Sequence, residues 1–549
     1  MIWPDGRFQL LAGLDADRVL IVKQVDASEE KAGVSRGAMT QHHLFDPLDP
    51  RRGPSYKHQT TTSVDYGVQP LLPYMISKHG PSIAVCDVNG DGLDDVFLTG
   101  ASGVAGQLFL QQKDMSFLAS PAGQPWEADK AHEDWGALCF DANGDGRPDL
   151  YLASGGYPLA PNSPLLQDRL YINHGGGKFA RDVQALPTML ASKATVRAGD
   201  FNGDGRPDLF VGGRLAPRKY PYPSRSYLLR NDGGRFTDVT EAVAPELAKS
   251  GGMITDAVWI DFDGDGRLDL VTVGEWMPIQ FYRNDGTHLR NVTRSTGLPP
   301  LRGWWSSLAT GDFDHDGRPD LVAGNLGLNH TYTTSKDSLF GIYAFDFTHN
   351  QTTDVVLTQE LSKIEYPFAG MVPLGREVYS LAIRFPTYGS FSDASIRQLF
   401  DPAQLRQAIH YQVDTFASVY LHNTGGGTFT SSALPNLAQI APIKGIVVHD
   451  VDGDGNLDLI VAGNLYDTEP NTPKADAGNG LWLRGDGRGH FVAVSPRESG
   501  FLAPRNVAGL ALVKTPAGQV VLVANTGDSL QAFGIRKREH GTGRTVPVP

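Results

Sequence analysis

No stretch of about 18 consecutive apolar residues occurs in this 549-residue sequence, so we expect no membrane-spanning helix. Aromatic residues make up only 9% of the chain, whereas it contains 63 glycines and 36 prolines. This composition is typical of many short strands joined by tight turns and argues against long helices.

Cysteine is scarce, because it occurs only as Cys86 and Cys139, outside any CxxC or Cys/His cluster. Zinc, redox and disulfide-framework interpretations therefore fail, and we expect two buried free thiols. The segment from Met1 to Arg7 has neither a basic n-region nor an apolar h-region, so no export signal is visible.

Basic charge is also in deficit, with 48 Lys and Arg against 61 Asp and Glu and a formal net charge of −13. Phosphate binding needs a basic stripe, and the arginines here are scattered, so we expect no nucleic-acid partner. Enzyme signatures are missing as well: there is no G-x-S-x-G elbow, no P-loop and no HExxH, and the 15 histidines are dispersed. We therefore expect a binding protein and no catalytic site.

What the sequence does contain is an internal repeat. The pattern Asp-x-(Asn/Asp)-x-Asp-Gly-x-x-Asp starts at Asp87, Asp141, Asp200, Asp261, Asp312 and Asp450, and the first five copies begin 51 to 61 residues apart. Short apolar runs bounded by glycine flank each copy, which indicates strands. Repeats of this length that each contain several strands are typical of propeller blades.

A second hairpin follows in several repeats, at residues 169–179, 226–236 and 418–429. Two hairpins per repeat make a four-stranded antiparallel blade, and a closed ring of blades buries both faces of each sheet. We predict an all-β, seven-bladed β-propeller over residues 81–535, or an eight-bladed one if a weaker copy at Asp346 has its own blade. A helical insertion is predicted at 360–416, with Asp401 as N-cap, Pro402 at N1, and Leu405, Ile409, Val413 and Phe416 at helical spacing.

The acidic loops are predicted calcium sites. Hard cations prefer six to eight oxygen ligands, which side chains at loop positions 1, 3, 5 and 9 and the backbone carbonyl at position 7 can supply. About six ions would add twelve positive charges and nearly cancel the net charge of −13. The expected ligands are Asp87, Asn89, Asp91, Leu93 and Asp95; Asp141, Asn143, Asp145, Arg147 and Asp149; Asp200, Asn202, Asp204, Arg206 and Asp208; Asp261, Asp263, Asp265, Arg267 and Asp269; Asp312, Asp314, Asp316, Arg318 and Asp320; and Asp450, Asp452, Asp454, Asn456 and Asp458. The weaker copy would use Asp346, Thr348, Asn350 and Asp354.

These motifs resemble the FG-GAP/VCBS propeller repeats of integrin α chains and of the cartilage acidic protein family. Residues 1–24, with Trp3-Pro-Asp-Gly-Arg7, look like the tail of an ASPIC/UnbV domain. The resemblance implies an exported, extracellular or outer-surface protein whose signal sequence lies upstream of this chain. It also implies a linker and entry segment at 25–80 and a flexible tail at 536–549. The departures are the insertion, the Asp-poor loop at 346 and His315 in place of glycine.

In such propellers, a partner would bind at the rim opposite the calcium loops. The predicted patch for a glycan or a peptide comprises Arg214, Glu275, Trp276, Trp304, Asn325, Asn464 and Tyr466. The alternative is that these side chains pack between blades or satisfy loop carbonyls. For the whole chain we expect an adhesion, binding or scaffolding module. The alternatives are a calcium-dependent polysaccharide lyase and a structural subunit of an outer-membrane assembly, docked through the insertion.

Overall fold

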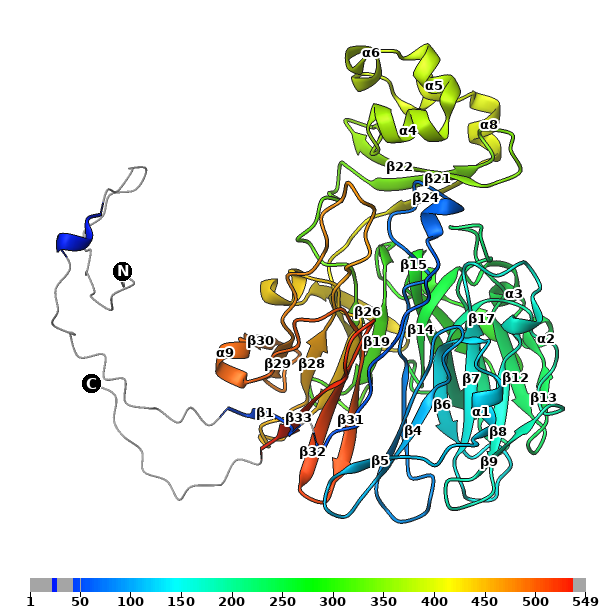
Figure 1. The fold of residues 1–549 in the computed structure, drawn as a ribbon, viewed down its shortest axis with the longest axis vertical. Helices are drawn as coiled ribbons and strands as arrows, with labels where there is room; N and C mark the ends of the chain where they lie inside the picture. The colour runs from blue at the N-terminus through cyan, green and yellow to red at the C-terminus, as the bar shows by residue number, and fades with distance from the viewer. Residues whose placement is uncertain (1–21, 27–42, 50, 537–549) are drawn as a thin grey trace. The chain divides into compact units, whose positions relative to one another are not determined.

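The computed structural model describes residues 22–26, 43–49 and 51–536. Across these residues it contains eight antiparallel sheets of four strands, one of them extended by a fifth short strand (Figure 1). The predicted all-β class is confirmed. The predicted ASPIC/UnbV tail at 1–24 and the predicted C-terminal tail at 536–549 lie almost wholly outside the described residues.

Seven sheets have the same plan, in which strands pair as neighbours in chain order, except that an insertion separates β20 from β25 and that β1 adds to the edge of the last sheet. They comprise β2 (Ile83–Cys86), β3 (Asp95–Leu98), β4 (Gln107–Gln111) and β5 (Phe117–Ala119); β6 (Glu133–Phe140), β7 (Asp149–Gly155), β8 (Arg169–Asn173) and β9 (Phe179–Asp182); β10 (Lys193–Gly199), β11 (Asp208–Gly213), β12 (Tyr227–Asn231) and β13 (Phe236–Asp238); β14 (Met253–Ile260), β15 (Asp269–Pro278), β16 (Gln280–Asn284) and β17 (Leu289–Asn291), with β18 (Arg302–Trp304) beside β15; β19 (Ser307–Gly311), β20 (Asp320–Gly324), β25 (Val419–Gly425) and β26 (Thr428–Ala433); β27 (Gly445–His449), β28 (Asp458–Ala462), β29 (Leu481–Gly485) and β30 (Phe491–Val494); and β31 (Val507–Thr515), β32 (Gly518–Asn525), β33 (Gln531–Ile535) and β1 (Phe45–Pro47). Short helices lie between strands of these sheets: α1 (Pro125–Ala128), α2 (Thr240–Val243), α3 (Pro245–Ser250) and α9 (Pro496–Ser499).

The first strands of these seven sheets form the inner wall of a ring. They contact one another in the order β2, β6, β10, β14, β19, β27 and β31, and β31 contacts β2 again. The second strands, such as β3 and β11, are buried along their whole length. Neighbouring sheets cover both of their faces, which explains why these strands read as continuous apolar runs in the sequence.

The last sheet takes its outermost strand from the other end of the chain. Strand β1 pairs antiparallel with β33, with Phe45 opposite Ile535, so the N-terminal and C-terminal segments share one sheet (Figure 1). Phe45 is fully buried and contacts the rings of Trp482 and Phe501. The sequence placed these residues in a linker, whereas the structure shows that they complete the ring.

The eighth sheet belongs to an insertion between β20 and β25, outside the ring of contacting inner strands. It contains β21 (Phe340–Phe345), β22 (Asp354–Leu361), β23 (Ile364–Pro367) and β24 (Ile409–Val413), and it carries the helices α4 (Met371–Glu377), α5 (Tyr379–Arg384), α6 (Tyr388–Ser392), α7 (Ile396–Leu399) and α8 (Pro402–Gln407) (Figure 1). The weak acidic copy at Asp346 lies in its β21–β22 hairpin.

The helical prediction for this insertion is correct at its start and wrong at its end. Asp401 caps α8 by accepting a hydrogen bond from the amide of Ala403 at 2.6 Å. The helix ends at Gln407, and Ile409 and Val413 lie in strand β24. Pairing of β24 with β21, which starts about 70 residues earlier, outweighs the local helical spacing.

The prediction of two free thiols is wrong. A disulfide joins Cys86, the last residue of β2, to Cys139 in β6, with Cα atoms 6.2 Å apart. The two residues are separated by 53 positions in the sequence, which is one repeat, so equivalent parts of neighbouring inner strands meet. The spacing of the two cysteines does not match a disulfide framework, because the packing of neighbouring blades, and not a local motif, brings them together.

Replacing both cysteines by serine is expected to lower the free energy of unfolding by about 2–4 kcal/mol, because the unfolded chain loses a 53-residue crosslink. Urea unfolding without reductant measures this difference, and the reduced wild-type protein serves as the matched control. Thiol titration of the unfolded, unreduced protein should find no free thiol. Two reactive thiols per chain would contradict the pairing.

Candidate metal-binding loops and the central channel

Each acidic loop connects the first and second strands of its sheet. The first loop starts at Asp87, directly after β2, and its last acidic residue, Asp95, is the first residue of β3. The same placement holds in the other five sheets, where the ninth loop residue begins β7, β11, β15, β20 or β28. Because the six loops join the same pair of strands, they lie at the same end of the ring.

The loop backbone folds around its first carboxylate. In the first loop, Asp87 accepts hydrogen bonds from the amides of Gly90, Asp91 and Gly92 at 2.7, 3.1 and 2.7 Å. Asn89 accepts from the amide of Asp91 at 2.9 Å. Gly90 and Gly92 have φ of 79° and 82°, a left-handed conformation that favours glycine. This turn collects the side-chain oxygens on the inside of the loop.

The other loops repeat this geometry. The first carboxylate accepts the same three amides in the loops beginning at Asp141, Asp200, Asp261 and Asp450. In the loop at Asp312, His315 takes the glycine position with φ of 61°. Asp312 still accepts the amides of Asp316 and Gly317, so the loop fold survives this departure.

The ninth loop residue is a buried aspartate that ties the loop to the sheet. Asp95 is 1% exposed and accepts the amides of Val88 in the loop and of Gln111 in β4, at 3.0 and 2.8 Å. Burial raises its pKa to about 6, and the neighbouring carboxylates of Asp91 and Asp87 add to the rise. A carboxylate in this setting gains stability from a nearby cation.

The other buried aspartates at this position behave in the same way. Burial raises the pKa of each carboxyl group: to about 6 for Asp149, Asp208 and Asp458, to about 7 for Asp269, and in the same direction for Asp320.

At three of the loops, three possible ligand residues lie with their ligand atoms within 4.8 Å of one another. The three sets are Asp261, Asp263 and Asp265; Asp450, Asp452 and Asp458; and Asp314, Asp316 and His422. The loops at Asp87, Asp141 and Asp200 have asparagine at position 3, which offers an amide oxygen in place of a carboxylate. This donor set of carboxylate and amide oxygens fits a hard divalent cation such as calcium.

The structure also shows two side-chain roles that the sequence did not predict. The predicted ligand at position 7 is a backbone carbonyl, but the arginine side chain there pairs with the position-5 aspartate: Arg206 Nη2 lies 2.6 Å from Asp204 Oδ2. His422 Nε2 in β25 lies 2.9 Å from Asp314 Oδ2, so the loop at Asp312 also has a nitrogen donor. The sequence did contain a signal for His422. It directly precedes Asn423, and the equivalent positions of other repeats are Ile172 and Arg230, neither of which is a metal ligand.

The weak copy at Asp346 keeps the turn but has fewer acidic groups. Asp346 accepts the amides of Asn350 and Gln351, both at 2.9 Å, and Asp354 begins β22. Thr348 donates its hydroxyl to Asp354 at 3.4 Å. Burial and the neighbouring Asp354 raise the pKa of Glu377, in α4, to about 7.

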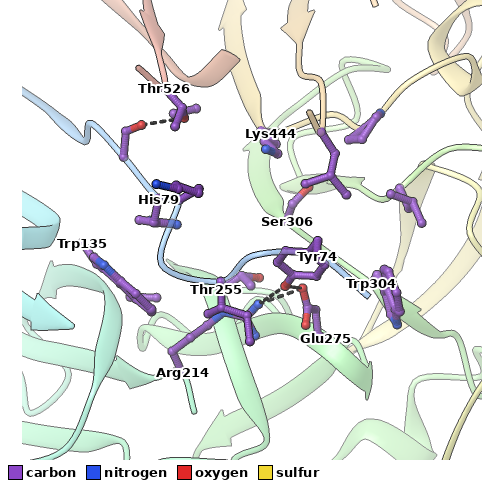
Figure 2. Close-up of a pocket in the computed structure, with 18 of the residues that line it drawn as sticks. Tyr74, His79, Trp135, Arg214, Thr255, Glu275, Trp304, Ser306, Lys444 and Thr526 are labelled. Atoms are coloured by element: carbon purple, nitrogen blue, oxygen red, sulfur yellow. Dashed lines mark hydrogen bonds and ion pairs between the residues drawn. The ribbon is translucent and has the colours of Figure 1, made fainter. Parts of the chain in front are cut away.

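Four residues of the predicted binding patch meet at the end of the ring opposite the acidic loops, but they are buried. Arg214 forms an ion pair with Glu275 at 2.8 Å. Arg214 also donates a hydrogen bond to the hydroxyl of Tyr74, which in turn donates to Glu275 (Figure 2). The rings of Trp276 and Trp304 lie 5.1 Å apart, and each side chain is 4% exposed. These four side chains therefore form part of the core and not an exposed surface.

The other three patch residues hold loop backbones in place. Asn325 is fully buried and accepts the amide of Trp304 at 3.1 Å. Asn464 is fully buried and donates to the carbonyl of Pro504 at 3.2 Å, and the half-buried Tyr466 donates to the same carbonyl at 2.8 Å. The contact of Asn464 matches the alternative that the sequence left open, in which Arg or Asn satisfies loop carbonyls, whereas that alternative had Tyr packing between blades.

A segment before the first strand covers this end of the ring. Residues 56–80 contact several blades: the amide of Met75 donates to the carbonyl of Asp467 at 2.8 Å, and Thr526 Oγ1 donates to the carbonyl of Gly80 at 2.7 Å. Within the described residues, the predicted linker at 25–80 is thus a packed part of the propeller from Leu44 onward. This covering segment is the reason that the predicted patch is buried.

Together, the ring of sheets and the repeated acidic loops define the class of protein, a β-propeller with an acidic loop in six of its blades. The FG-GAP-like repeat model matches residues 87–152, 141–211, 220–272 and 261–323, and the FG-GAP repeat model matches residues 194–229. These matches bear out the repeats at five of the six predicted loops, those that start at Asp87, Asp141, Asp200, Asp261 and Asp312.

Two curated relatives are similar to part of the chain. Human cartilage acidic protein 1 is 24% identical over 296 residues, 48% of this chain and 41% of that protein. The mouse protein of the same name is 27% identical over 232 residues, 40% of this chain and 33% of that protein. The match therefore spans less than half the length of either relative.

Among solved structures, BBS1N in complex with ARL6DN aligns with 90% of this chain and 98% of its own, at 10% identity and a TM-score of 0.42. The V. cholerae biofilm matrix protein Bap1 aligns with 88% of this chain and 91% of its own, at 10% identity and a TM-score of 0.33. In the part of the chain that the structure describes, no helix is long and apolar enough to cross a membrane.

Proposed function

We propose that this chain is a calcium-stabilised β-propeller that acts as a binding or scaffolding module outside the cytoplasm. The observation that carries the calcium proposal is the shared hydrogen-bond pattern of six loops. In every one, the carboxylate at position 1 accepts hydrogen bonds from backbone amides of its own loop. One such loop would be an ordinary turn, but six equivalent ones in a ring favour a common ligand.

The residues proposed to hold each ion are those at positions 1, 3, 5 and 9, with the position-7 carbonyl. Calcium bound there supplies the positive charge that offsets repulsion between the carboxylates. Asp95 and its equivalents link each loop to the third strand of the sheet, through hydrogen bonds such as that from the amide of Gln111. Binding at the loop would thereby hold the first three strands of a blade together.

Two features support a location outside the cytoplasm. The disulfide between Cys86 and Cys139 is a type of crosslink that persists in oxidising compartments. Loops without a bidentate glutamate bind calcium weakly, with Kd on the order of 10⁻⁴–10⁻³ M, which suits extracellular calcium levels. The proposed ASPIC/UnbV tail at 1–24 belongs to the same proposal of an exported, surface-located protein.

The partner is proposed to be a protein that docks on the insertion. Large apolar side chains are exposed there: Tyr379 by 72%, Ile383 by 67% and Tyr388 by 68%. Tyr379 and Ile383 are four residues apart in α5, so they share one face of the helix. Grouped exposed apolar side chains are typical of protein interaction sites. The predicted glycan patch, by contrast, is buried.

Changing Tyr379 and Ile383 to serine is expected to abolish capture of a partner from native membranes without altering the melting temperature. The readout is the loss of a specific co-purified band relative to wild type. Val492→Ser, an exposed apolar position on β30 that is 64% exposed, is the matched control and should retain the band. Equal capture by the double variant and the wild type would place the partner elsewhere.

We further propose that the chain binds without catalysing a reaction. The rival activity is elimination on an acidic polysaccharide, which creates an unsaturated uronate that absorbs ultraviolet light. Incubation of the protein with alginate, pectate or heparin in calcium should give no rise in the ultraviolet absorbance of the unsaturated uronate. A steady rise that depends on protein concentration would overturn the proposal in favour of a lyase.

A further inference from the structure

The innermost strands surround a channel that contains two adjoining cavities. The larger, of about 240 Å³, is lined by residues from all seven innermost strands, among them Ile83, Ala137, Val196, Asp256, Leu308, Ile446 and Leu510. The smaller, of about 140 Å³, is lined by the covering segment from Tyr74 to Gly80 and by strand ends beneath it. Both cavities are lined by His79, Trp135 and Lys444, so they adjoin one another, and Figure 2 shows these three side chains around one pocket.

Lys444 is a cation without a fixed partner in this channel. Its side chain makes no hydrogen bond or ion pair within 4.0 Å with any residue that the structure describes. Burial lowers its pKa to about 8, and the more distant carboxylates of Asp467 and Glu275 offset this only in part. Lys444 is partly exposed and lines both cavities, so its ammonium faces the channel without a counterion, and an anionic ligand there would supply one.

The other charged groups that line the smaller cavity already have partners. Arg214 pairs with Glu275 at 2.8 Å and donates to Tyr74 at 3.0 Å. Lys78 donates to the carbonyl of Thr61. Burial lowers the pKa of His79 to about 3, so this imidazole is neutral at physiological pH.

The remaining walls combine aromatic and apolar side chains with those of Thr255, Ser306 and Thr526. The ring of His79 lies 4.8 Å from that of Trp135, and Trp304 and Leu326 line the same cavity. An apolar cavity of about 150 Å³ is large enough to hold a benzene ring. The smaller cavity, of about 140 Å³, is close to this size. The site therefore combines an ammonium that has no protein partner with space for one small apolar group.

We propose that the central channel binds a small aromatic or aliphatic monocarboxylate, with its carboxylate at Lys444 and its apolar part against Trp135 and Trp304. A single ammonium balances one negative charge, whereas a phosphate dianion is bound best by several donors or by the fork of an arginine. The guanidinium groups that line the two cavities are already engaged, Arg214 by Glu275 and Arg197 by Asp256.

Calorimetric titration with sodium benzoate tests the proposal, in buffer that contains calcium. Benzoate should bind the wild type saturably, and Lys444→Met should weaken binding at least ten-fold. The exposed Lys514→Met is the matched control and should bind as the wild type does. Because the methionine removes a partly buried charge that has no partner, Lys444→Met is expected to melt no lower than the wild type, so loss of binding reports on the site.

Two further ligands sharpen the test. Benzamide has the same ring without the charge and should bind the wild type at least ten-fold more weakly than benzoate. Inorganic phosphate should bind more weakly still. The proposal is overturned if benzoate does not bind the wild type, if it binds Lys444→Met equally well, or if phosphate binds more tightly than benzoate.

Discussion

Removal of calcium with EDTA is expected to lower the melting temperature of this protein by roughly 10 °C or more. A ligand at a hundred times its Kd stabilises the folded state by about 2.7 kcal/mol per site, and the six loops lie in one ring of contacting sheets. Without the ions, carboxylates such as Asp261, Asp263 and Asp265 remain within 4.8 Å of one another. Thermal unfolding followed by circular dichroism in 10 mM calcium and in EDTA measures the difference.

Restoring calcium in excess should recover the original melting temperature, and this reversal is the control for damage by the chelator. Elemental analysis of the protein after gel filtration in calcium should find about six ions per chain. Identical melting curves in calcium and EDTA, together with no bound divalent metal, would contradict the metal assignment. The FG-GAP-like repeats and the propeller fold would stand unchanged by that result.

Phe45→Ala is expected to lower the free energy of unfolding by about 3–5 kcal/mol. Phe45 is fully buried in β1, the outermost strand of the last sheet, where it contacts the rings of Trp482 and Phe501. Its loss leaves a cavity at the junction between the two ends of the ring. Urea unfolding of the two proteins under equal calcium measures the change.

Leu118→Ala is the matched control, since Leu118 also lies in an outermost strand, β5, but is 57% exposed. Its effect should stay within about 1 kcal/mol, because little buried surface is lost. Equal and small effects of both substitutions would mean that β1 does not close the ring in solution.

The acidic loops could be predicted because their information is local. Nine consecutive residues specify both the turn, through glycines such as Gly90, and the donor set, through Asp87 and its neighbours. Six copies repeat this pattern, so the repeat length and the flanking strands follow from the same stretch of sequence. The all-β class came from this periodicity and from the glycine-rich hairpins.

The contacts that the sequence did not reveal join residues far apart in the chain. Cys86 and Cys139 meet because neighbouring inner strands pack together, and β24 forms a strand because β21 pairs with it. Trp276 and Trp304 were predicted to lie on an exposed rim, because no residue near them in the sequence indicated that the segment containing Tyr74 would cover them. No nine-residue window contains these relationships.

The sequence by itself determined the repeating blade, the position of each acidic loop and the chemistry of its side chains, because residues close in the chain fix turns and ligand spacing. Only the tertiary structure decided which ends meet, which rim is covered and where an unpartnered lysine faces a cavity. Those outcomes depend on the packing of sheets around a ring, where β1 meets β33 and the segment from Tyr74 to Gly80 lines the channel.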